Sequence, residues 1–363
     1  MFEVLITELD LCGANAIQNA LSPGGPRNWR ELLGHQNWLT LSMKKFLKWF
    51  GLGLLGILLV GPFLIPVNTS GTLTKEQAAS EIWGDKSNWV ELAGHEVHYV
   101  QAGDPESERL VVLLHGFGAS AYSYRDVLEP LATLGHVIAY DRAAFGFTER
   151  PTSWDVNPYG AEGQLQVLDE LIAKFGAGKE VFIVGHSAGG NLAASYTVDN
   201  PDKLAGSVLY APAVSNRGGG TSWLNWIYSV PQLNHIGPLL VSSIATNGLD
   251  LLYLSYNDPD SVTEQTLAGY TQPLKVAGWE RAFWEFNRAP RNTGVSERLG
   301  EISIPTLVLT GDNDLVVETA DSIEVAGLIA GAELVVIRET GHLPNEESPE
   351  EFAQAVIDFV ERN

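Results

Sequence analysis

The chain has 363 residues, of which 45% are hydrophobic and 18% charged, and its formal net charge at pH 7 is −22. These fractions are those of a folded protein with a sizeable core and exclude a disordered chain. The acidic balance leaves no basic stripe to neutralise phosphates, which argues against nucleic acid as a partner. The single cysteine, Cys12, excludes an intramolecular disulfide and a cysteine-based metal site.

The N-terminal part of the chain differs in composition from the rest. Residues 49–67 are almost wholly apolar, and their number is close to the roughly 20 residues that span a bilayer. Three lysines precede this run, so the positive-inside rule predicts that residues 43–67 form a transmembrane signal anchor, with the following part outside the cytoplasm. Because Met43-Lys-Lys resembles the start of an export signal, we interpret residues 1–42 as an extension from an upstream start choice.

Two other interpretations of the apolar run are open: a cleaved signal peptide, which would release a secreted protein, and a buried core helix. No Ala-x-Ala-like cleavage site follows Val67, which favours the uncleaved anchor. A core helix has no need of three lysines at one end and would show a polar face.

The segment after the apolar run, residues 68–87, is expected to be a linker because it is polar. In residues 88–214 and 296–363, short apolar runs alternate with helical patterns. This alternation predicts an α/β fold, with a mostly parallel sheet and helices on both faces. Residues 215–295 contain no strand pattern and many aromatic residues, which predicts a helical lid over the site. An insertion with its own small core is the alternative.

The strongest local motif lies between an apolar run at 181–184 and a helical pattern at 188–198. It has the form Gly-x-Ser-x-Gly, with Ser187 between Gly185 and Gly189. A nucleophile at such a strand–helix turn has a strained backbone, and side chains two residues away on either side would clash. The helix N-terminus also offers free N–H groups to a developing oxyanion. A tight turn with an ordinary serine is the alternative interpretation.

Ser187, Asp314 and His342 each follow a predicted strand, at the sheet edge where ligands bind in open α/β sheets. A serine hydroxyl needs a base to accept its proton, and the base needs a carboxylate to fix its tautomer. Of the eight histidines, only His342 follows the last predicted strand in a glycine-containing loop. Asp314 is preferred over Asp312 as the acid because it lies deeper in its loop, and Asp312 is then a turn residue.

The glycine-rich segment Gly116-Phe117-Gly118 follows another predicted strand, so its backbone can approach a substrate closely. The N–H groups of Phe117 and Ala188 are the expected oxyanion donors, although a plain turn would also explain the glycines. Further along, Asp141 and Arg142 are expected to form an ion pair that pins a loop. The sequence contains no metal-ligand cluster and no phosphate-binding loop, so neither a cofactor nor a metal is expected.

Taken together, these motifs resemble the α/β-hydrolase superfamily, and in style its branch of lidded esterases and meta-cleavage-product hydrolases. The resemblance implies that Ser187 is the nucleophile, His342 the base and Asp314 the acid. It also implies Phe117 and Ala188 as the oxyanion donors. A serine at the elbow argues against the epoxide hydrolases and haloalkane dehalogenases of this fold, which use aspartate there. The matching segments, between Trp89 and the C-terminus, are His115–Gly118, Asp141–Thr148, Gly185–Gly190, Gly311–Asp314 and Gly341–Pro344.

The leading hypothesis for the function is hydrolysis of a carboxylic ester through an acyl-enzyme intermediate. The aromatic lid and the membrane anchor favour a small-molecule substrate with an apolar acyl or alcohol part. Hydrolysis of an amide, thioester or carbon–carbon bond would use the same residues and is open. A non-catalytic ligand-binding receptor that keeps the fold is the hypothesis from another class.

Overall fold

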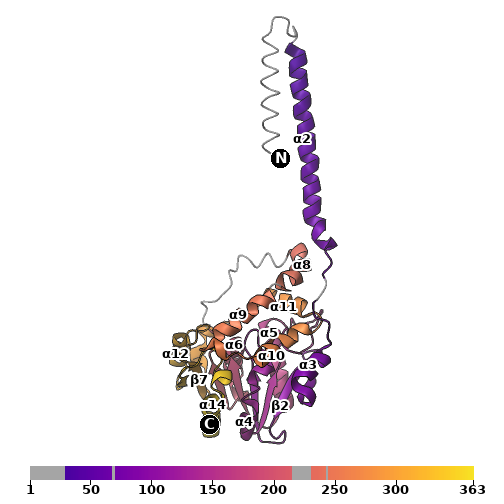
Figure 1. Ribbon diagram of the computed structural model, residues 1–363. Helices are drawn as coiled ribbons and strands as arrows, with labels where there is room; N and C mark the ends of the chain where they lie inside the picture. The colour runs from indigo at the N-terminus through magenta and orange to yellow at the C-terminus, as the bar shows by residue number, and fades with distance from the viewer. Residues whose placement is uncertain (1–28, 68–69, 215–229, 243) are drawn as a thin grey trace. The chain divides into compact units, whose positions relative to one another are not determined.

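The computed structural model describes residues 29–67, 70–214, 230–242 and 244–363, which Figure 1 draws as ribbons. The chain forms two units, Met1–Ile65 and Pro66–Asn363. Each of the two units folds around its own internal contacts, and they are described in turn.

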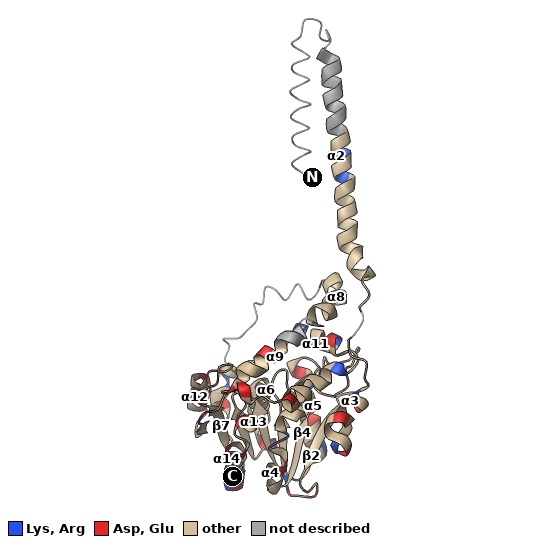
Figure 2. Cartoon of the chain, in the orientation of Figure 1, with Lys and Arg blue, Asp and Glu red and all other residues tan. Residues whose placement is uncertain are grey.

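The described residues of the first unit form a long helix, α2 (Trp29–Val60), which is followed by a short 3-10 turn. Its segment Ser42–Leu64, 23 residues with a mean hydropathy of 1.8 in an 18-residue window, is long and apolar enough to cross a membrane. In Figure 2 the described helix beyond Lys48 carries no charged residue. The helix begins upstream of the predicted anchor because no proline interrupts it. Residues 1–28 of the predicted extension lie outside the described residues.

The second unit is built on an eight-stranded sheet with the strand order β1-β2-β4-β3-β5-β6-β7-β8. The pairs β1–β2 and β2–β4 are antiparallel, and all other neighbours are parallel. The central strands are buried along nearly their whole length, which explains their continuous apolar runs. The strands are β1 (Asn88–Leu92), β2 (His95–Ala102), β3 (Arg109–Leu114), β4 (His136–Tyr140), β5 (Glu180–His186), β6 (Gly206–Tyr210), β7 (Thr306–Gly311) and β8 (Glu333–Ile337).

Helices cover both faces of this sheet, as the sequence predicts. Residues of α5, α6 and α12 pack on one face, and residues of α4 and α14 pack on the other, each in a separate apolar cluster. The α/β fold, with a mostly parallel sheet between two helical layers, is therefore confirmed (Figure 1). The helices are α4 (Leu128–Leu131), α5 (Ala161–Phe175), α6 (Ser187–Asp199), α12 (Thr319–Leu328) and α14 (Pro349–Arg362).

The segment predicted as a linker is partly packed against the body. Lys75–Trp83 form helix α3, which begins with a capping box at Thr74. Ala78 and Ala79 of this helix are fully buried. The polar residues that suggested a linker lie on the solvent side of a short helix, so composition alone did not reveal the packing.

The stretch between β6 and β7 forms helices and turns, with no strand among its described residues. Residues of this insertion line one cavity together with residues that follow β3 and β5, so the insertion lies over the carboxyl ends of these strands. Residues 215–229 of the predicted lid lie outside the described residues. The helices of the insertion are α8 (Pro231–Ser242), α9 (Ile244–Ser255), α10 (Glu264–Thr271) and α11 (Trp279–Arg288).

Candidate active site

The Gly-x-Ser-x-Gly motif forms a sharp turn between β5 and α6. Ser187 is the first residue of α6, and its φ of +49° lies in the left-handed region. A Cβ atom on Gly189 would lie 2.4 Å from the carbonyl oxygen of Leu114, and one on Gly185 would lie 2.6 Å from the Cβ of Ala193. The turn therefore has both the backbone strain and the lack of neighbouring space that a nucleophile elbow requires.

His342 lies after β8, in the loop before the short helix α13 (Pro344–Glu347). Its Nδ1 is 2.7 Å from Oδ2 of Asp314, and both side chains are almost fully buried. The other carboxylate oxygen, Oδ1, accepts the N–H groups of Val316 at 2.8 Å and Val317 at 2.9 Å. Two backbone donors thus hold the carboxylate, and the carboxylate holds the proton of His342 on Nδ1, which leaves Nε2 free.

Asp312, the alternative acid, lies apart from this pair. Its side chain is exposed, and its Oδ1 accepts the N–H of Thr340 at 3.3 Å. Of the two candidate carboxylates, the structure therefore brings Asp314 to His342.

Ser187 and His342 line one cavity of about 210 Å³. None of the lining residues in the described part of the chain is a lysine, arginine, aspartate or glutamate. In the described parts of the chain, no group of three His, Cys, Asp or Glu side chains is arranged to hold a metal ion. The walls come mainly from large apolar side chains, including Leu251, Leu252, Leu274, Trp279, Phe283 and Val316.

The glycine-rich segment after β3 lies beside the elbow. Phe117 and Gly118 line the same cavity, and Gly118 has a φ of +71° that a side chain would strain. A Cβ atom on Gly116 would lie 3.2 Å from the Cβ of Ser187. The N–H of Ala188 belongs to the first turn of α6, where the helix itself offers no acceptor. The segment and the first turn of α6 are thus neighbours at Ser187.

His186, the residue before the elbow serine, supports the loop that carries His342. Its Nε2 donates to the carbonyl oxygen of His342 at 2.9 Å, and its ring stacks on Tyr210 with centroids 4.6 Å apart. Burial, together with the nearby His342, holds the pKa of His186 well below its ordinary value. The ring is therefore neutral, and its contacts are structural.

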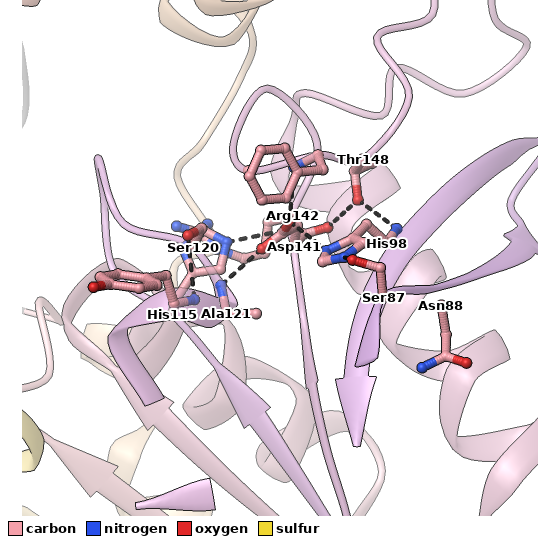
Figure 3. A network of polar contacts seen from close by, with 12 residues as sticks. Ser87, Asn88, His98, His115, Ser120, Ala121, Asp141, Arg142 and Thr148 are labelled. Carbon is pink, nitrogen blue, oxygen red and sulfur yellow. Dashed lines mark hydrogen bonds and ion pairs between the residues drawn. The ribbon is translucent and has the colours of Figure 1, made fainter. Parts of the chain in front are cut away.

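A second Asp–His pair, which sequence reasoning missed, lies at the end of β4 (Figure 3). Oδ2 of Asp141 is 2.7 Å from Nδ1 of the fully buried His98, whose Nε2 is 3.2 Å from Oγ of Ser87. The carboxylate also accepts the N–H groups of Ala121 and Phe147. Burial raises the pKa of Asp141, but His98 and these hydrogen bonds outweigh it and hold that pKa below its ordinary value. Both members of the pair are almost fully buried, so the pair braces the fold.

The predicted ion pair between Asp141 and Arg142 is wrong. Arg142 directs its guanidinium to Oε1 of Gln164 at 2.7 Å and to the carbonyl oxygen of Gly116 at 2.9 Å. Side chains of consecutive residues in extended backbone point to opposite sides, which separates the two charges.

Comparison with known proteins places the chain in a family. The family model described as "Alpha/beta hydrolase family" matches residues 111–355, which is more than half of the chain. Monoacylglycerol lipase abhd6-A of Xenopus laevis is 24% identical over 267 residues, which cover 72% of this chain and 78% of that protein. The 2-hydroxy-6-oxo-6-(2'-aminophenyl)hexa-2,4-dienoic acid hydrolase of Metapseudomonas resinovorans is 27% identical over 282 residues, which cover 76% and 90%.

Solved structures show the same fold. The enol-lactonase from Burkholderia xenovorans LB400 has a TM-score of 0.60 at 20% identity and covers 75% of this chain and 99% of its own. A membrane phospholipase A, described as a bacterial virulence factor, has a TM-score of 0.58 at 22% identity and covers 92% and 98%. The relatives are hydrolases named for different substrates, so they support a hydrolase without deciding the bond. The chain belongs to the alpha/beta hydrolase family.

Proposed function

We propose that this protein is a serine hydrolase that cleaves a carboxylic ester through an acyl-enzyme intermediate. The observation that most supports the proposal is that Ser187 and His342, which Asp314 holds, line one cavity whose described lining residues include no lysine, arginine, aspartate or glutamate. A nucleophile, a base and an orienting carboxylate are the groups that acyl transfer by serine needs.

In the proposed mechanism, Oγ of Ser187 attacks the ester carbonyl carbon while Nε2 of His342 takes the hydroxyl proton. The N–H groups of Phe117 and Ala188 stabilise the negative charge that develops on the carbonyl oxygen. The imidazolium, stabilised by Asp314, gives its proton to the leaving alcohol, and the acyl group stays on Ser187. A water molecule that passes its proton to His342 then attacks the acyl-enzyme and releases the carboxylic acid.

The lining of the cavity favours a neutral substrate with a long apolar part. A dienoic acid, the substrate named for one relative, carries a carboxylate, and burying a carboxylate without a cationic partner is costly. Among the described residues, those that line the cavity include no lysine or arginine. An ester with an apolar acyl chain, as in the monoacylglycerol named for another relative, loses no such interaction. We therefore favour ester hydrolysis over carbon–carbon bond hydrolysis.

We further propose that the apolar part of α2 anchors the protein in a membrane, with the hydrolase unit outside the cytoplasm. The segment Ser42–Leu64 has the length and composition of a span, and lysines precede its most apolar part. Near the start of the hydrolase unit, Oγ of Ser70 accepts the indole N–H of Trp279 at 3.0 Å. Trp279 also lines the cavity, so Ser70 lies beside the proposed substrate site. Recovery of the protein in the soluble fraction after cell lysis would contradict the anchor.

The ester hypothesis is tested with a fluorophosphonate probe and nitrophenyl esters of graded acyl length. We expect labelling and turnover in the wild type, with a preference for longer chains, and neither in Ser187→Ala. Ser195→Ala, which removes a second buried hydroxyl two turns further along α6, is the matched control and is expected to keep both. Absence of Ser187-dependent labelling and turnover would favour a non-catalytic receptor. Faster turnover of a dienoic acid than of any ester would favour carbon–carbon hydrolysis.

A further inference from the structure

We infer that Arg142, a buried cation with no step of its own in ester hydrolysis, positions and polarises the oxyanion donor of Phe117. It acts through the peptide group that joins Gly116 to Phe117. This inference rests on the proposed function, because it assigns Arg142 a task in the same site. Arg142 is a positioning residue here, since it contacts the donor peptide and not the reacting atoms.

Two side-chain donors hydrogen-bond to the carbonyl oxygen of Gly116. Nη2 of Arg142 donates to it at 2.9 Å, and Nδ1 of His115 donates at 2.8 Å. Because a trans peptide is planar, the N–H of Phe117 points away from this carbonyl oxygen. Phe117 lines the cavity that contains Ser187. Holding the carbonyl oxygen on the protein side therefore turns the N–H toward the place where the ester carbonyl would lie.

His115 has the tautomer that this arrangement requires. Its Nε2 accepts the backbone N–H of Arg142 at 3.0 Å, so the proton of the neutral ring is on Nδ1, which donates to Gly116. Burial, with a contribution from the charge of Arg142, lowers the pKa of His115 to about 3. The ring therefore stays neutral over the working range of pH, and its donor does not switch.

The charge of Arg142 has no carboxylate partner in the described part of the chain. Only 2% of the residue is exposed, and its other side-chain acceptor is Oε1 of Gln164. Burial lowers the pKa of Arg142 to about 10, so the guanidinium is still charged at neutral pH. A buried cation without a counter-ion is costly. Here the charged guanidinium donates a hydrogen bond to the carbonyl oxygen of Gly116. Such a charge-assisted bond polarises the peptide group and makes the N–H of Phe117 a stronger donor.

A second arginine, the half-buried Arg150, offers a control. It also donates to backbone carbonyl oxygens, those of Val276, Pro273 and Gly146. Burial lowers the pKa of Arg150 to about 10, as it does for Arg142. None of its acceptors belongs to the elbow or to the segment that carries the oxyanion donor. Arg150→Met therefore removes another cation that donates to backbone carbonyl oxygens, without changing the Gly116 peptide.

The experiment compares Arg142→Met and Arg150→Met in the full chain, with three compounds of similar acyl length. The first is a nitrophenyl ester, the second is a trifluoromethyl ketone whose serine adduct carries an oxyanion, and the third is an ether without a carbonyl group. For Arg142→Met we expect kcat/KM and the ketone affinity to fall together by about 10- to 100-fold, somewhat less than the loss of a whole oxyanion donor. The ether affinity should not change. Arg150→Met should lower thermal stability and leave kcat and the ketone affinity near those of the wild type.

Equal losses of ketone and ether affinity in Arg142→Met would overturn the inference, because they would show a general structural defect. An unchanged kcat would overturn it as well. If Arg142→Met does not fold, Arg142→Gln replaces it, since glutamine keeps a donor but not the charge. Unchanged ketone affinity in that variant would then refute the polarising effect. A wild type that neither turns over esters nor reacts with fluorophosphonate would contradict the proposed function, whereas an active wild type with an unaffected Arg142→Met contradicts this inference alone.

Discussion

Replacing Asp314 by asparagine tests the orientation of the proposed base. Asparagine has the same shape, and its Oδ1 can still accept the N–H groups of Val316 and Val317. Its NH2 group, however, would face Nδ1 of His342, which must then become an acceptor. The proton of the neutral ring moves to Nε2, the nitrogen that has to take the proton of Ser187. The variant is therefore expected to fold normally with a base in the wrong tautomer.

The expected loss is large in kcat and small in stability. Reversal of the tautomer in a Ser-His-Asp arrangement lowers kcat by about 10⁴-fold. At 1.36 kcal/mol for each factor of ten, this corresponds to about 5.4 kcal/mol of lost transition-state stabilisation. Because a neutral hydrogen bond replaces a charge-assisted one, the free energy of unfolding should fall by only about 1–2 kcal/mol.

Asp312→Asn is the matched control for this experiment. The residue is two positions away, exposed, and bound through its carboxylate to one backbone N–H at 3.3 Å. We expect its kcat to stay close to that of the wild type. Steady-state ester hydrolysis and urea unfolding measure both quantities. An Asp314→Asn variant with nearly wild-type kcat, or an equal loss in Asp312→Asn, would refute the assignment of the acid.

Two further predictions concern the elements that hold the site in place. Asp141→Asn should lower the free energy of unfolding by about 3–5 kcal/mol, because it breaks a buried pair with His98. The pKa of Asp141 is lowered in the folded protein, so its contribution to stability is present above the unfolded pKa and is lost as pH falls through the folded value. In urea unfolding, the free energy of unfolding of Asp141→Asn should therefore fall less steeply from neutral to acid pH than that of the wild type. The exposed Asp155→Asn should keep the pH dependence of the wild type. Gly189→Ala should destabilise the protein by about 1–3 kcal/mol and lower kcat, because the new Cβ meets a β3 carbonyl oxygen at 2.4 Å. Gly327→Ala, with open space around the new Cβ, should leave kcat unchanged in the same melting and activity assays.

Those parts of the fold and the site that depend on local sequence were predictable. The strands after which Ser187, Asp314 and His342 lie are continuous apolar runs between turn residues, so their order and the positions of their ends could be identified. Parallel strands in a doubly covered sheet bring their carboxyl ends to one edge, which explains why Ser187 and His342 line one cavity and why His342 contacts Asp314. The preference for Asp314 over Asp312 used only position in the loop, and the geometry of the structure agrees with it.

The contacts that the prediction missed depend on pairing between distant segments. His98 reaches Asp141 because β2 pairs antiparallel with β4, with Tyr99 opposite Tyr140. The composition of the two strands does not predict this register. The segment that forms β2 has the alternating pattern of an ordinary strand, so the sequence contains no separate sign that the imidazole of His98 is buried. Arg142 was assigned to its neighbour in sequence, although its acceptors lie in other segments of the fold.

The insertion also contacts the loop that carries His342, and this contact connects the helices over the cavity with the proposed base. The backbone N–H of His342 donates to the carbonyl oxygen of Ser255, at the end of α9, at 2.7 Å. Glu347 lies between the two segments: its Oε2 accepts the N–H of Asn257 at 2.6 Å, and its Oε1 accepts the N–H of Gly341 at 2.9 Å. One carboxylate therefore joins the end of α9 to the residue before His342.

Glu347→Gln removes half of this connection, because a glutamine amide group has one acceptor oxygen where the carboxylate has two. One of the two backbone N–H groups then faces an NH2 group, and the loop has to shift. A displacement of the base by about 1 Å can cost on the order of 100-fold in rate, so we expect kcat to fall by about 10- to 100-fold. Urea unfolding should show a smaller change, since the core helices are untouched. The exposed Glu350→Gln, in the adjacent helix α14, is the control. If Glu347→Gln kept the kcat of the wild type, the end of α9 would not determine the position of His342, and the insertion would act only as a cover.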